Sequence, residues 1–230
     1  MRRLLLVLLL ALSGCSAHAS DGTRVTVLAA ASLTKAFGEE ATAYERAHPG
    51  TDVVLSFAGS QSLVAQVQQG APADVLATAD PATMGAVRGE LEDPSVVFAH
   101  NELAIVTAPG NPLHLTSLQD LTRSGLKVVL AGPSVPVGKA AAKALTRAGV
   151  RVTPVSLEDA VTGVVGKVRL GEADAGIAYV TDLGGGVGGV PLGGTRTDLA
   201  IGPLTGAGRA FVQFVLGAEG QAILKKHRFQ

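Results

Sequence analysis

Serines and other small residues recur where predicted strands give way to helices, and their hydroxyl and backbone N–H groups suit the binding of an anion. The positions are Ser32, Ser60, Val137 with Gly138, and Val161. The first turn of a helix carries N–H groups without intrahelical partners and about half a positive charge. Several such turns around one cleft would make an anion site. A lone serine there more often just caps its helix, so the site depends on the fold bringing these ends together.

The chain alternates strand and helix patterns along most of its length. Short β-branched or apolar runs predict strands over 25–28, 52–57, 74–78, 102–107, 127–130, 175–179 and 197–201. Apolar residues at helical spacing predict helices over 32–48, 60–69, 137–148, 160–170, 208–216 and 220–226, and Asp80-Pro81 opens another. We therefore predict an α/β protein of two lobes, each a mostly parallel sheet flanked by helices. In such sheets ligands bind at the carboxyl ends of the strands.

Composition narrows the classes of function. The 230 residues are 47% hydrophobic and 17% charged, which suits a packed core rather than a disordered chain. Lys and Arg together number 19, as do Asp and Glu, so nucleic acid is not an expected partner. The single Cys excludes an intrachain disulfide framework, and the absence of Trp argues against aromatic cages. The five His show no metal-ligand spacing.

The first residues have the pattern of a targeting signal. Arg2 and Arg3 precede an apolar run over 4–12 that is too short to span a bilayer. The run ends in Leu-Ser-Gly before Cys15, which resembles a bacterial lipobox, where the Cys becomes the lipidated first residue. We predict a lipoprotein signal peptide over 1–14 and a lipidated tether over 15–22. The protein would then act outside the cytoplasm, held at the membrane by the lipid on Cys15. The other interpretation is a secretory signal with a chance Cys.

Three patterns could indicate an enzyme. The glycines of 184–189 fit a dinucleotide fingerprint, but no helical pattern follows them, so we expect a glycine loop. The stretch 132–139 resembles a phosphate-binding loop with one residue too many, and Ala140 stands where a magnesium-binding hydroxyl belongs. Ser32 and Lys35 form the S-x-x-K of penicillin-binding acyl-transferases, yet the chain has neither S-D-N nor K-T-G. We expect no enzyme, and a serine acyl-transferase using Ser32 and Lys35 stays open as a remote alternative.

Four segments together carry a family resemblance. They are Ala29 to Leu33, Ser56 to Ser60, Gly70 to Val75 and Gly171 to Tyr179. In order and spacing they resemble the molybdate-binding protein of bacterial ABC uptake systems, from about residue 25 to the C-terminus. The resemblance implies a type II periplasmic-binding-protein fold that holds a molybdate or tungstate dianion between its lobes.

The resemblance also implies which residues bind the ion. Two match family serines, two stand where the family uses backbone amides, and one matches a phenol that donates to the ligand. In that order they are Ser32 and Ser60, Val137 and Val161, and Tyr179. The sequence departs from the family beside them. Gly59 replaces a common hydroxyl residue and Ala160 a commonly polar one, so we expect the turn before Val161 to differ.

The implied site contains no Arg, Lys or resident metal, and molybdenum would enter only as the oxyanion, without direct side-chain ligands. Neutral N–H and O–H donors can replace the water around a dianion, because hydrogen bonds to a charged group contribute about 1.5–3 kcal/mol each. Donors that cannot accept also disfavour protonated anions. Sulfate has the charge and shape of molybdate, so only the size of the cavity can distinguish the two ions.

These inferences together predict the organisation and the partners of the chain. We expect lobe 1 over 23–101 and 202–230, and lobe 2 over 102–201. The predicted function is capture of molybdate or tungstate and delivery to an ABC permease and its cytoplasmic ATPase, as a monomer without a cofactor. A receptor for another tetrahedral oxyanion such as sulfate is the alternative. A tyrosine-bound ferric ion is disfavoured because the chain has two Tyr.

Overall fold

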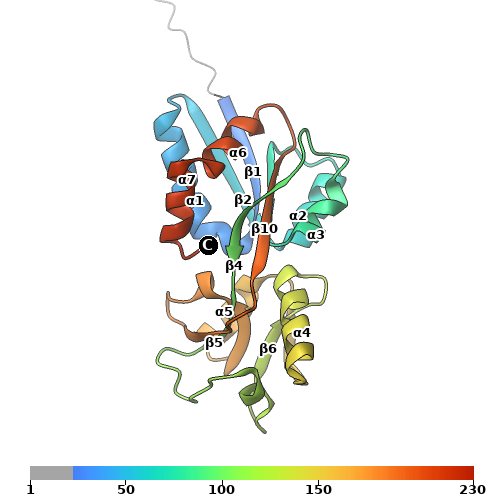
Figure 1. Cartoon of the computed structure of the whole chain (residues 1–230), viewed down its shortest axis with the longest axis vertical. Coiled ribbons are helices and arrows are strands. Elements are labelled where there is room, and N and C mark those ends of the chain that lie inside the picture. The colour runs from blue at the N-terminus through green and yellow to red at the C-terminus, as the bar shows by residue number, and fades with distance from the viewer. Residues whose placement is uncertain (1–22) are drawn as a thin grey trace, which may run out of the picture.

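The computed structural model describes residues 23–230, which form two α/β lobes stacked along the long axis of the molecule (Figure 1). Each lobe is built on a five-stranded sheet. The predicted signal peptide, the tether and Cys15 lie outside the described residues. Within 23–230, every helix is too short or too polar to cross a membrane.

The sheet of lobe 1 has the strand order β2-β1-β3-β10-β4. Strand β10 runs antiparallel to both of its neighbours, whereas β1 is parallel to β2 and β3. The strands are β1 (Thr23–Ala30), β2 (Thr51–Ala58), β3 (Val75–Thr78), β4 (Val96–Asn101) and β10 (Thr197–Pro203). The helices are α1 (Thr34–Ala47), α2 (Ser60–Gln68), α3 (Pro81–Met84), α6 (Gly208–Leu216) and α7 (Ala218–Lys226), with 3₁₀ turns at Ala31–Leu33 and Gly85–Val87.

Both faces of the lobe 1 sheet are covered, and the alternation of β1 shows why. Val27 packs with Phe37 of α1 and Phe211 of α6 in one buried cluster. The next residue, Leu28, points the other way and packs with Leu63 of α2 in a second cluster. Successive side chains of a strand point to opposite faces, so an unbroken apolar strand requires helices on both sides.

The sheet of lobe 2 has the order β7-β6-β8-β5-β9. Here β5 runs antiparallel to β8 and β9, and β6 is parallel to β7 and β8. The strands are β5 (Leu103–Thr107), β6 (Val128–Ala131), β7 (Ser156–Glu158), β8 (Ala175–Tyr179) and β9 (Gly188–Pro191). Helices α4 (Pro136–Ala148) and α5 (Val161–Arg169) pack on this sheet, and 3₁₀ turns lie at Leu118–Thr122 and Val180–Asp182. The predicted two-lobed α/β class is confirmed, with one reversed strand in each sheet.

Two segments connect the lobes. The chain leaves lobe 1 between β4 and β5, which are separated only by Glu102, and returns between β9 and β10. The side-chain amide of Asn101 donates to Thr181 Oγ1 at 2.8 Å, and Leu103 N–H donates to Thr195 Oγ1 at 3.0 Å. We expected the return after Ile201, but β10 pairs with β3 and β4, so the return precedes Thr197.

The glycine-rich stretch also differs from expectation. Gly184, Gly185 and Gly186 have positive φ and form a loop, as predicted. The expectation of a loop over the whole of 184–189 is wrong at its end, because Gly188–Pro191 is strand β9, paired with β5. A Cβ on Gly189 would lie 2.5 Å from the carbonyl oxygen of Ile105. Glycine therefore allows the close approach of these two strands.

Candidate functional site

A small cavity lies between the lobes where β1, β2, β6 and β8 end. The structure brings all five of the predicted residues to its wall: Ser32, Ser60, Val137, Val161 and Tyr179. The rest of the wall is small or apolar, with Ala30 and Ala58 from the same loops and Ala79 from the end of β3. Segments that are far apart in the sequence thus meet at one place.

Four helical segments begin at this cavity, and none of them has a side-chain cap. Their N-cap residues are Ala30, Gly59, Val135 and Ala160, none of which makes a side-chain cap hydrogen bond. Away from the cavity, α3 is capped by Asp80. Because the first N–H groups of a helix have no intrahelical partner, uncapped starts leave these donors for a ligand. Pro136 has no N–H, so Val137 provides the first N–H of α4.

Two of the three hydroxyl groups at the cavity have no hydrogen-bond partner, and the third keeps a proton that it can donate. Ser32 Oγ and Tyr179 OH are buried and have no hydrogen bond. Ser60 is 2% exposed, and its Oγ accepts from Ala79 N–H at 3.0 Å, so its own proton is left to donate. Ser32 and Ser60 therefore do not cap their helices. An unpaired buried polar group costs about 1–3 kcal/mol, which an acceptor in the cavity would relieve.

The size of the cavity matches a tetrahedral oxyanion. The centre of a water molecule can move through about 20 Å³ of it. If the radius of water is about 1.4 Å, a spherical cavity that leaves this volume to the centre of the water molecule has a radius of about 3 Å. The radius of a tetrahedral oxyanion is one bond from the central atom plus one oxygen radius, also about 3 Å. An ion of this size would fit the cavity.

No charged side chain lines this cavity. Two carboxylates outside the cavity, those of Asp182 and Asp80, act on the phenol of Tyr179. Burial, and then the negative charges of Asp182 and Asp80, raise the pKa of Tyr179 well above its usual range, so its phenol stays protonated and can donate. Asp182 accepts the backbone N–H of Tyr179 at 3.0 Å. Burial raises the pKa of Asp182 to about 7, against the opposing effects of this hydrogen bond and then of Lys35.

Contacts across the cavity hold the lobes together. Gln61 of lobe 1 donates to the carbonyl oxygen of Asp159 in lobe 2 at 2.7 Å. Lys139 of lobe 2 reaches Thr83 Oγ1 at 3.0 Å and Asp80 at 3.6 Å, both in lobe 1. The structure is therefore a closed form. These residues were not predicted from the sequence, because a contact between lobes leaves no local pattern.

The geometry gives no support to an acyl-transferase. Ser32 Oγ has no hydrogen-bond partner, so Lys35 does not contact it as a general base would. Among residues 23–230 no group of three or more His, Cys, Asp or Glu residues could hold a metal ion. The cavity offers hydrogen-bond donors and no nucleophile–base pair.

Two lobes, two connecting segments and a closed cavity rich in donors define a two-lobed solute-binding protein of the type II class. A family model described as bacterial extracellular solute-binding protein matches residues 25–230. The chain therefore belongs to this family, whose members bind and transport solutes rather than catalyse reactions.

The most informative relatives bind molybdate. The molybdate-binding protein ModA of Mycobacterium tuberculosis is 45% identical over 166 residues, which are 71% of this chain and 64% of that protein. The protein of the same name from Escherichia coli is 32% identical over 175 residues, 71% of this chain and 68% of that protein. This confirms the resemblance found in the sequence. The chain spans less than two thirds of the length of its mycobacterial relative.

Solved structures confirm the fold. The periplasmic molybdate-binding protein of Azotobacter vinelandii superimposes with a TM-score of 0.77 at 19% identity, covering 90% of this chain and 98% of that one. The sulfate-binding protein SubI of Mycobacterium tuberculosis gives a TM-score of 0.79 at 19% identity, covering 90% and 86%. At such identities the likeness concerns the fold alone, and it does not distinguish one oxyanion from another.

Proposed function

We propose that this chain is an extracytoplasmic lipoprotein that captures molybdate or tungstate between its lobes and delivers it to an ABC importer. The ligand-binding side-chain groups are the hydroxyls of Ser32, Ser60 and Tyr179. The ligand-binding backbone groups are the N–H groups of Ser32, Ser60, Val137 and Val161. The observation that carries the proposal is a pair of buried hydroxyls without partners in a cavity free of charged side chains.

The donors suffice for tight binding without a cationic side chain. Three hydroxyls and the four backbone N–H groups named above could make about five to seven charge-assisted hydrogen bonds of about 1.5–3 kcal/mol each. The gross sum of about 8–20 kcal/mol must exceed the cost of association. Binding in the micromolar to nanomolar range requires about 8–12 kcal/mol, so the donor set is adequate.

The cavity favours a fully deprotonated tetrahedral anion. Each identified group presents a proton to the ligand, and the raised pKa of Tyr179 keeps its proton in place. A hydrogenphosphate would direct its own O–H at a donor, which leaves a buried conflict. Molybdate is favoured over sulfate by the names of the sequence relatives.

Closure of the lobes links capture to delivery. The hydrogen bond of Gln61 to Asp159 and the ion pair of Lys139 with Asp80 form only when the lobes meet. Closure buries the ion and creates the surface that a membrane permease would recognise. The lipid on Cys15 would keep the receptor near its permease.

A thermal-shift panel tests the choice of ligand. We expect molybdate and tungstate to raise the melting temperature, because a ligand bound only by the folded state stabilises it. Sulfate and phosphate at the same concentration should have little effect. Equal stabilisation by sulfate would identify a receptor for a different oxyanion, and no stabilisation by any of the four ions would refute an oxyanion receptor.

Lipid attachment is tested separately on the full chain. Expressed in a bacterium, the parent should fractionate with membranes and incorporate labelled palmitate. Cys15→Ser should abolish the label and release the protein into the soluble fraction, with molybdate binding unchanged. Labelling that persists in Cys15→Ser would contradict anchoring at this residue.

A further inference from the structure

A second, larger cavity adjoins the binding cavity on the α4 side. It has a volume of about 300 Å³ and lies between α4 and the segment 194–198, which carries the return to lobe 1. Ala79, Pro136 and Tyr179 line both cavities. We call this second cavity the cationic groove, for the charges described next.

The groove concentrates positive charge in a chain whose formal charge is zero. Lys139, Lys143 and Arg147 line one side, and Arg196 lines the other. Residues four apart lie on the same face of a helix, so α4 presents its three cations in one row. The carboxylates of the groove are those of Asp80 and Asp198. Four cations against two carboxylates leave a local excess of positive charge.

Two of these cations are engaged and two are free. Lys139 pairs with Asp80 at 3.6 Å. Arg196 lies 3.5 Å from Asp198, which also accepts from His100 at 2.7 Å. Lys143 and Arg147 are exposed, and neither forms an ion pair with any residue of 23–230. Their charge is therefore available to an incoming anion.

We propose that the cationic groove attracts small dianions, which gather there before the lobes admit one to the binding cavity. This inference rests on the proposed function, since it supplies the route to the same site. The binding cavity uses neutral donors, which act only at contact distance. Unpaired cations act over a Debye length, about 8–10 Å at ordinary salt. The cations of the groove would therefore attract the ion from a distance, and the neutral donors of the binding cavity would retain it.

The groove attracts the ion and does not retain it. Exposed ammonium and guanidinium groups in water hold an anion weakly, because the high dielectric and salt screen them. Focused charge near a cleft instead raises association rates, by about 10- to 1,000-fold in strong cases. Neutralising Lys143 and Arg147 should thus slow association and leave dissociation from the closed cavity unchanged.

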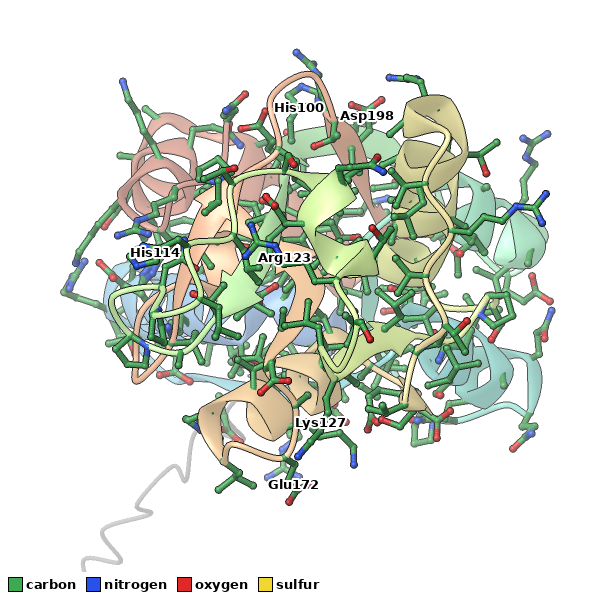
Figure 2. All side chains as sticks on the ribbon, turned by 90° about the horizontal axis from the view of Figure 1, so that it is seen from below. His100, His114, Arg123, Lys127, Glu172 and Asp198 are labelled. Atoms are coloured by element: carbon green, nitrogen blue, oxygen red, sulfur yellow. The ribbon has the colours of Figure 1, made fainter. Side chains whose placement is uncertain are left out.

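The test compares two double variants with the same change of charge. The groove variant is Lys143→Gln with Arg147→Gln. The control is Lys127→Gln with Lys225→Gln, both exposed and neither lining any cavity described here. In Figure 2, Lys127 lies at the opposite side of the view from Asp198, which lines the groove. All four residues are exposed, so both variants should fold.

Molybdate is the probe, and its Kd is measured by calorimetry at low and high ionic strength. Association is followed by stopped-flow tyrosine fluorescence, since the chain has no Trp and one of its two Tyr lines the binding cavity. At about 0.01 M salt, where the Debye length is about 30 Å, the groove variant should associate about three- to tenfold more slowly. Its Kd should weaken by the same factor. At about 1 M salt, charges are screened beyond about 3 Å. The association rates and Kd values of the parent, the groove variant and the control should then converge.

The outcomes separate this inference from the proposed function. If the groove variant and the control associate equally fast at low salt, the groove does not steer the ion, although the chain still binds it. If the variant's loss persists at high salt, the two residues act by contact or through structure, which also overturns steering. If the parent binds no molybdate, the proposed function fails and the groove fails with it.

Discussion

The closed arrangement of this chain leaves no room for a Cβ at position 59. Gly59 precedes α2 at the cavity, and a Cβ added there would lie 2.4 Å from the carbonyl oxygen of Asp159 in the other lobe. Its φ of −61° and ψ of 137° are ordinary for alanine. The other close neighbour is the side-chain amide of Gln61, 2.6 Å from the added Cβ, which can rotate aside. Gly59→Ala therefore fits the backbone of lobe 1, and its conflict with a fixed backbone atom arises in the closed form.

The size of the effect follows from the geometry. A real Cβ contact is essentially never shorter than 3.0 Å, so the lobes must separate by several tenths of an ångström or more. That displacement stretches the bond of Gln61 to Asp159, now 2.7 Å, and moves the donors of lobe 2 away from the ion. Losing one charge-assisted hydrogen bond costs about 1.5–3 kcal/mol, so we expect binding to weaken by about 10- to 150-fold.

Calorimetric titration with molybdate measures the effect, with thermal melting of the ligand-free protein beside it. The melting temperature should be unchanged or slightly higher, because Gly→Ala restricts the unfolded chain. Gly38→Ala in α1, where a Cβ would meet nothing within 4 Å, is the matched control and should bind like the parent. Parental affinity in Gly59→Ala would refute the argument that ligand binding uses this closed form.

Three further predictions concern single side chains. Tyr179→Phe removes a buried hydroxyl without a partner, so it should leave the ligand-free melting temperature equal or higher while weakening molybdate binding by about 1.5–3 kcal/mol; a fall in both would indicate a structural role. Ser60→Ala should cost at least about 1.5 kcal/mol of binding in calorimetry, and an unchanged Kd would remove Ser60 from the site. Glu40 is 0% exposed, and its pKa is raised to about 8 by burial and then by Glu219 and Glu39. The unfolded chain therefore loses this proton at lower pH, and the free energy of unfolding should decrease from about pH 4.5 to about pH 8, by several kcal/mol at most. Urea melts should show a flatter pH dependence in Glu40→Gln, and an identical slope would contradict the assignment.

Much of the fold could be predicted because its signals are local. Strand β8 begins and ends as expected, and α2 and α6 agree to within a residue, since apolar periodicity and glycine stops determine them. Strands β4, β7 and β9 were missed. The segment of β9 consists of glycine, valine and proline, which have no strand periodicity, and only pairing with β5 orders it.

The candidate site, like the fold, could be predicted from the sequence only in part. The residues that follow strand ends could be named, because the carboxyl edge of a sheet is a predictable place for a ligand. The absence of side-chain caps at Ala30, Gly59, Val135 and Ala160 was not predicted, because it depends on the residue at which each helix begins. The pairing of Gln61 with Asp159 could not be found, because it depends on how two lobes meet.

The central claim is that uncharged hydroxyl and amide groups hold a dianion without a cationic side chain. A crystal structure of the protein grown with tungstate tests it directly, since the anomalous signal of tungsten locates the ion. We expect one strong peak between the lobes, with oxygens within hydrogen-bond distance of Ser32, Ser60 and Tyr179. A peak held by lysine or arginine side chains, with the interlobe cavity empty, would contradict the account.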